Sequence, residues 1–165
     1  MVWGLRICLG ALVLAYAAWL GLPLVEAVSA ETPVMQVWAD LAPTGSPLGP
    51  GLAILLLATI LLYGLGGIAT ALRLSWAPGL FFLGFLGEIA LRLTVASDTQ
   101  TVPAALDIAA RVDAALRPFG VLVETTPLSL AALLAVGLCI LATGVWRGQK
   151  GAALTRVWTQ PPVWA

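Results

Sequence analysis

The sequence predicts an all-α integral membrane protein, folded as a four-transmembrane-helix bundle with one amphipathic helix on its outer surface. Two observations lead to this fold class. Of the 165 residues, 61% are hydrophobic and only 10% are charged, whereas a soluble domain is about 25% charged. The chain also contains four apolar stretches, each close to the roughly 20 residues that a helix needs to cross a bilayer.

The four predicted spans cover about residues 7–25, 50–72, 76–96 and 125–146, within a transmembrane domain over residues 1–147. Three of the spans contain no charged residue, and the third is interrupted only by Glu88 and Arg92. Pro23, near the end of the first span, is expected to end or kink that helix. Residues 148–165 are expected to form a cytoplasmic C-terminal tail.

The first span has an alternative interpretation as a cleavable signal peptide. Arg6, the apolar run and the small residues Val28 and Ala30 fit the pattern that signal peptidase recognises. The apolar run of about 19 residues is longer than the usual 7–15 of such a peptide. A retained helix is therefore the favoured interpretation, and cleavage would leave three spans.

Charge predicts the orientation, because basic residues concentrate on the cytoplasmic side of a membrane. The N-terminus, the turn between the second and third spans and the C-terminal tail carry only basic charges. The first long loop carries only acidic charges, and the second carries both signs. We therefore expect both termini to be cytoplasmic, in a bacterial inner membrane. The basic residues are Arg6, Arg73, Arg147, Lys150 and Arg156.

The second long loop contains the predicted amphipathic helix, over residues 103–119. Asp107 with Arg111, and Asp113 with Arg117, have the i,i+4 spacing of helical ion pairs. Ile108, Val112, Ala115 and Phe119 form one apolar stripe. Such a helix can lie on the outer membrane face, as a contact for a partner, a lid or an interfacial linker.

Glu88 and Arg92 are the candidate functional pair, because they are the ionisable residues inside a predicted span. Their spacing of four places them on one helix face. Intramembrane charges mark ion or substrate pathways, but they also neutralise each other in packing or partner docking. The other spans contribute few polar groups, so packing or docking is the favoured interpretation. These groups are Tyr16, Thr59, Tyr63 and Thr143.

Small residues predict where helices approach closely. The fourth span has such a stripe at four-residue spacing, and two glycines precede Glu88 on the third span. Tryptophans favour the membrane interface, and three of them fall at predicted cytoplasmic boundaries. The packing residues are Ala131, Ala135, Cys139, Thr143, Gly84 and Gly87, and the interface anchors are Trp3, Trp76 and Trp146.

Composition excludes several chemistries. The chain has no histidine, which removes bis-histidine haem, the common zinc sites and histidine acid–base catalysis. The two cysteines, Cys8 and Cys139, form no CxxC motif. We therefore expect no catalytic residue and no metal, and the formal net charge of zero predicts no nucleic-acid partner. No cofactor is predicted, although lipid, quinone or pigment could lie between the helices.

Residues 48–66, LGPGLAILLLATILLYGLG, resemble the second span of the small membrane subunits of tricarboxylate transporters. The short turn after Arg73 and the long charged outer loop differ from that family. No residue role is carried over from the resemblance.

Two functions remain open. The first is a non-catalytic accessory subunit of a larger inner-membrane complex, such as a respiratory, photosynthetic or transport assembly. The second is a small transporter or channel component that uses Glu88 and Arg92. The first is favoured by the missing catalytic groups, the small-residue faces and the outer helix.

Overall fold

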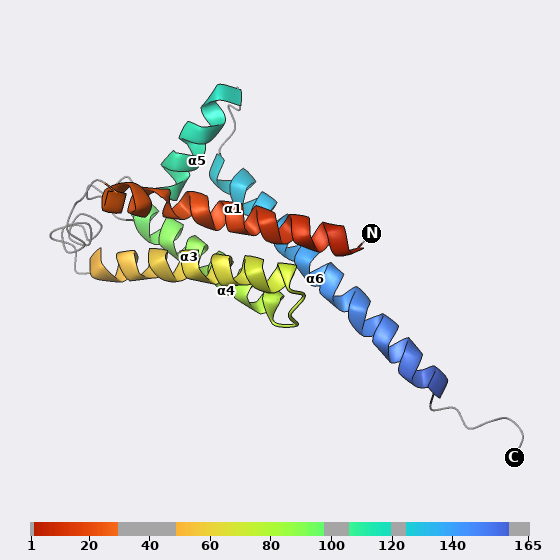
Figure 1. The fold of residues 1–165 in the computed structure, drawn as a ribbon. Coiled ribbons are helices and arrows are strands. Elements are labelled where there is room, and N and C mark those ends of the chain that lie inside the picture. The colour runs from red at the N-terminus through yellow and green to blue at the C-terminus, as the bar shows by residue number, and fades with distance from the viewer. Residues whose placement is uncertain (1, 30–48, 98–105, 120–124, 159–165) are drawn as a thin grey trace, which may run out of the picture.

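The computed structural model describes residues 2–29, 49–97, 106–119 and 125–158. These residues form five α-helices and one short 3-10 helix, and no strand occurs among them. Four of the helices are long and apolar enough to cross a membrane. The structure therefore confirms the predicted all-helical class with four candidate spans (Figure 1).

The long helices coincide with the predicted spans but extend further at some ends. They are α1 (Val2–Ser29), α3 (Gly49–Ala71), α4 (Ala77–Ser97) and α6 (Thr125–Trp158). Helix α1 continues past Pro23, so this proline does not end the helix, which was one of the two effects expected from the sequence. Helix α6 continues past residue 146 into the predicted tail, because the intervening sequence contains no proline to stop it.

Helices α3 and α4 form the antiparallel hairpin that their short connection predicts. The amide of Leu74 donates to the carbonyl of Ala69 at 2.9 Å, and that of Arg73 donates to Thr70 at 3.2 Å. This pair of bonds is a Schellman motif, and Arg73 has the left-handed backbone that the motif requires, with φ of 62°. The Arg73 guanidinium lies over the Trp3 ring, 5.5 Å from its centroid, and so joins the turn to the start of α1.

Helices α1, α3 and α4 pack side by side, whereas α6 runs obliquely and its C-terminal part leaves the bundle (Figure 1). The backbones of α1 and α3 approach each other closely. A Cβ atom added at Gly10 would lie 2.8 Å from the carbonyl oxygen of Gly67. Large buried side chains fill the interior, among them Leu20, Leu56, Phe81, Leu91 and Ile140.

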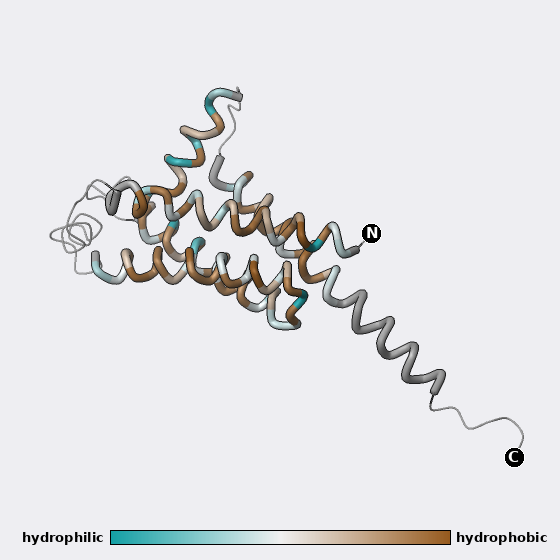
Figure 2. The backbone as a smooth tube through the Cα atoms, in the orientation of Figure 1, coloured by the Kyte–Doolittle hydropathy of each residue, from teal (hydrophilic) through white to brown (hydrophobic). Residues whose placement is uncertain are grey.

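The short helix α5 (Ile108–Leu116) and the following 3-10 helix η1 (Arg117–Phe119) lie in the predicted amphipathic segment. Asp107 caps α5, because its carboxylate accepts a hydrogen bond from the Ala110 amide at 2.9 Å. Ile108 and Val112 are buried, which fits one apolar face (Figure 2). The predicted pair of Asp113 and Arg117 is confirmed at 3.3 Å. Residues 103–105 of the predicted helix lie outside the described part of the chain.

Candidate functional site

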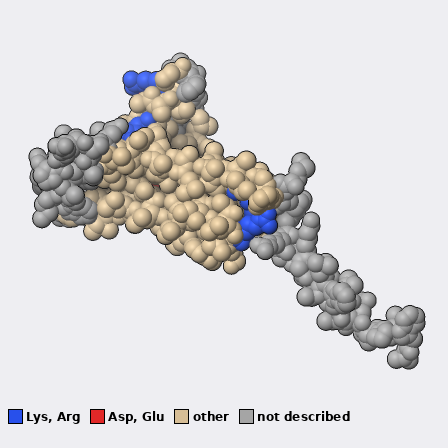
Figure 3. Space-filling model, viewed as in Figure 1, with Lys and Arg blue, Asp and Glu red and all other residues tan. Residues whose placement is uncertain are grey.

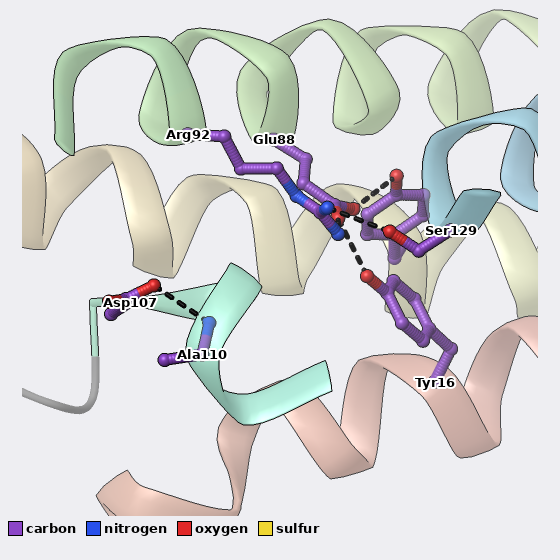
Figure 4. A network of polar contacts seen from close by, with 7 residues as sticks. Tyr16, Glu88, Arg92, Asp107, Ala110 and Ser129 are labelled. Carbon is purple, nitrogen blue, oxygen red and sulfur yellow. Dashed lines mark hydrogen bonds and ion pairs between the residues drawn. The ribbon is translucent and has the colours of Figure 1, made fainter. Parts of the chain in front are cut away.

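The candidate site is a polar cluster in the middle of the bundle, centred on Glu88 of α4. This carboxylate is 0% exposed. Tyr16 of α1 donates its hydroxyl to Oε1 of Glu88 at 2.7 Å. Tyr63 of α3 donates to Oε2 at 2.9 Å. Two neighbouring helices thus each supply one hydrogen bond to a single buried carboxylate (Figure 4).

Arg92 supplies the positive charge of the cluster. It lies one helical turn beyond Glu88, as the sequence spacing predicts, and its Nη2 forms an ion pair with Glu88 Oε1. Its Nη1 donates to Ser129 Oγ of α6 at 2.8 Å. The buried pair is therefore bonded to all three of the other long helices, through Tyr16, Tyr63 and Ser129.

Aromatic packing holds the two tyrosines in place. The rings of Tyr16 and Tyr63 meet edge to face, with centroids 5.4 Å apart. Tyr63 meets Phe81 in the same way at 5.4 Å, and Tyr16 stacks on Trp19 at 5.9 Å. Such pairs contribute about 0.5–1.5 kcal/mol each beyond the burial of their area. The hydroxyls consequently reach Glu88 from an ordered aromatic layer.

Gly84 and Gly87 admit α3 to the face of α4 that carries Glu88. A Cβ atom at Gly84 would lie 3.3 Å from the Tyr63 ring, and one at Gly87 would lie 2.6 Å from Thr59 Oγ1. A larger residue at Gly84 would therefore press on the Tyr63 ring, and one at Gly87 would displace Thr59. The structure places both glycines at a close helix contact.

The small-residue stripe of α6 divides into two parts. Thr143 is buried and accepts a hydrogen bond from Nε of Arg6, a buried residue of α1, at 3.1 Å. Ala131, Ala135 and Cys139 are exposed. The contact with α4 is made by another residue, since a Cβ atom at Gly137 would lie 2.6 Å from the Phe81 ring. Contact of the stripe with a partner stays a prediction.

The interface tryptophans Trp3 and Trp76 are exposed, at 62% and 51%. The side chain of Trp146 lies outside the described part of the structure. On the face shown in Figure 3, basic side chains gather near α5 and at the end that carries the N-terminus, and the surface between them is uncharged.

Arg111 of α5 binds the backbone of α1. Its Nη2 donates to the Trp19 carbonyl at 2.6 Å and its Nη1 to the Leu20 carbonyl at 3.3 Å. Pro23 has no amide hydrogen to donate to the carbonyl of Trp19, four residues earlier. Arg111 thus satisfies the acceptor that the proline leaves open, which explains why α1 continues through it. The guanidinium also lies 4.6 Å from the centroid of the Trp19 ring.

Two hollows adjoin the cluster. An open apolar groove of about 450 Å³ lies between α1, α5 and α6, with Tyr16 and Ser129 in its wall. It is roomy enough for an apolar ligand such as a lipid tail. A smaller cavity of about 250 Å³ lies where α4 meets the start of α5, and Arg92 and Asp107 form part of its wall.

Sequence reasoning located Glu88 and Arg92 but missed how their surroundings converge. It counted Tyr16 and Tyr63 as isolated polar groups, although phenols in otherwise apolar spans are themselves a signal of a buried acceptor. Nothing in the sequence pattern points to Ser129. Gly10 also escaped notice, because its importance depends on which residue lies opposite.

Within the described ranges, no group of three or more acidic or cysteine side chains could hold a metal ion. No protein-family description matches the chain, and no curated protein or solved structure is significantly similar to it.

Proposed function

We propose that this protein is a non-catalytic accessory subunit of a larger complex in a bacterial inner membrane, respiratory, photosynthetic or transport in kind. The observation that carries the proposal is the internal bonding of Glu88. Both of its oxygens accept hydrogen bonds, and the facing cation is on the same helix. An intramembrane charge used in this way fixes how helices pack.

The exposed part of α6 supplies the docking surface in this proposal. Ala131, Ala135 and Cys139 lie at four-residue spacing and are exposed along one helix. Small residues in such a row let a second transmembrane helix approach closely. The expected partner is therefore a transmembrane helix of another membrane subunit.

Gentle detergent extraction of the tagged protein from native membranes, followed by mass spectrometry, tests this function. We expect larger membrane subunits to co-purify in fixed stoichiometry. Ala135→Trp should remove them, whereas Leu134→Trp, on an exposed neighbouring position outside the stripe, should retain them. Recovery of the wild-type protein alone, or only with copies of itself, would refute the accessory role.

For orientation, we propose that both termini are cytoplasmic. Arg6 and Arg73 support this assignment, since the start of α1 and the α3–α4 turn lie at the same end of the bundle (Figure 1). Basic residues at one end favour the cytoplasmic side. In this orientation, α5 lies at the outer face.

A second candidate function is that of a small transporter or channel component. The buried Nε of Arg92 favours it, because this atom has no hydrogen-bond partner within the described residues. An ion path through the cluster predicts that Glu88→Gln abolishes flux in proteoliposomes, while Arg117→Gln on the surface of α5 leaves flux intact. Flux that survives Glu88→Gln would eliminate this candidate.

A further inference from the structure

The cavity between α4 and α5 adjoins a buried cation whose hydrogen bonding is incomplete. Arg92 is 7% exposed, and two of its three nitrogens have partners in Glu88 and Ser129. The third nitrogen, Nε, is buried and has none among the residues that the structure describes. A buried donor without an acceptor costs about 1–3 kcal/mol. Arg92 is thus a buried polar residue that its protein partners do not fully satisfy.

The cavity has the size and the polar residues in its wall to hold water. Its volume is about 250 Å³, and a water molecule occupies about 30 Å³ of liquid. Arg92 lines it from α4, and Asp107 lines it from the start of α5. Asp107 is half-buried, and its Oδ1 already accepts from the Ala110 amide. A cationic and an acidic residue therefore line one space, and polar residues of this kind can hold a water cluster.

The position of the cavity indicates from which end of the bundle solvent would enter it. Asp107 belongs to the helix cap outside the four candidate spans, whereas Arg92 lies within the third of them. Val95 and Ala96 form the rest of the wall on α4. The space thus lies at the α5 end of the bundle and reaches Arg92, the residue that is paired with Glu88.

From these observations we propose that the cavity is a hydrated vestibule, which admits water and small polar solutes from the α5 end to Arg92. Water there solvates the part of Arg92 that lines the cavity. It also places the aqueous phase one ion pair away from Glu88. The vestibule is compatible with either proposed function, so a result that contradicts it would not refute the accessory role.

Cysteine accessibility tests the vestibule. The native cysteines Cys8 and Cys139 are both exposed, so Cys8→Ala and Cys139→Ala give a background without thiols. Val95→Cys places a thiol in the cavity wall. Leu93→Cys is the matched control, because Leu93 is 66% exposed on the outside of the same helix. Each variant is reconstituted in nanodiscs and treated with a charged, membrane-impermeant methanethiosulfonate reagent.

A thiol reacts with this reagent as the thiolate, which forms only where water solvates it. We therefore expect Val95→Cys to react about tenfold faster than Leu93→Cys. Adding Ala109→Trp, which fills the wall on α5, should slow the Val95→Cys reaction. Ala110→Trp, on an exposed neighbour outside the cavity, should not slow it.

Equal rates for the Val95→Cys and Leu93→Cys variants would overturn the proposal, and so would equal effects of the two tryptophan substitutions. Thermal unfolding of each variant in the same nanodiscs identifies any that does not fold. If the Val95→Cys variant is among these, Ala96→Cys on the same wall replaces it.

Discussion

At the scale of single residues, the bundle depends on buried charges that are paired and hydrogen-bonded across helices. Glu88 and Arg92 are both buried, and each is bonded to other helices. A charge in the bilayer interior is expensive unless it is paired and hydrogen-bonded. The sequence reveals the pair by its spacing alone. It does not reveal the tyrosines, because their position depends on how three nearly uniform apolar helices rotate against one another.

The buried pair predicts an unusual order of stabilities. Arg92→Met removes one partner and leaves Glu88 unpaired, which should lower the free energy of unfolding by about 3–5 kcal/mol. Adding Glu88→Gln to Arg92→Met removes the remaining charge while keeping a carbonyl oxygen for a tyrosine. The double variant should therefore be more stable than Arg92→Met alone.

Thermal and chemical unfolding in nanodiscs measures this order. Arg117→Met is the control, because Arg117 belongs to an exposed pair on α5 and such pairs contribute about 0–1 kcal/mol. A double variant that is less stable than Arg92→Met would show that Glu88 gains its stability from the tyrosines and not from the arginine.

At the scale of helices, the sequence predicts the bounds of each helix better than it predicts which face of the helix is buried. Each span is visible as an apolar run bounded by charges or loop residues, and α3 and α4 agree with the predicted bounds to within a residue. A helix that is apolar on all sides carries no periodic signal for its buried face. The sequence therefore shows the small-residue stripe of α6 but not that Gly137, which lies outside the stripe, contacts Phe81.

The crossing of α1 and α3 predicts a strong effect of Gly10→Leu. A side chain there would meet the backbone of Gly67, which cannot move aside as a flexible side chain would. We expect a loss of about 1–3 kcal/mol in unfolding free energy, as in other overpacked interiors. Gly4→Leu on the same helix, with nothing within 4 Å of the added atom, should have little effect. Similar losses in both variants would argue against a close crossing.

The contact between Arg111 and α1 predicts coupling to Pro23. Arg111→Met should destabilise the protein, because the Trp19 carbonyl loses its donor. Pro23→Ala restores the amide that normally binds this carbonyl within the helix. Arg111→Met should therefore cost less in a Pro23→Ala background, by about 1 kcal/mol in a double-mutant cycle. Additive effects, measured by unfolding of all four proteins, would contradict this account of the proline.

At the scale of the whole molecule, the structure shows which segments lie at the same end of the bundle. The charge pattern predicts which end is cytoplasmic. The basic turn at Arg73 lies beside Trp3 at the start of α1. Helix α5 contacts α1 at Trp19 and Leu20, far along that helix from Trp3. The turn and α5 thus belong to opposite ends of the bundle. By the positive-inside rule, we propose that the turn is cytoplasmic and that α5 lies outside.

This orientation predicts the labelling of two single-cysteine variants in intact cells. Ser75→Cys places a thiol in the turn, and Ala114→Cys places one on α5; both positions are exposed. With the native cysteines replaced by alanine, a membrane-impermeant maleimide should label Ala114→Cys and leave Ser75→Cys unlabelled. After the membrane is permeabilised, both should react, since neither thiol is buried in the bundle. Labelling of Ser75→Cys alone in intact cells would mean that the bundle is inserted the other way. The acidic first loop would then lie in the cytoplasm, against the charge pattern of the chain.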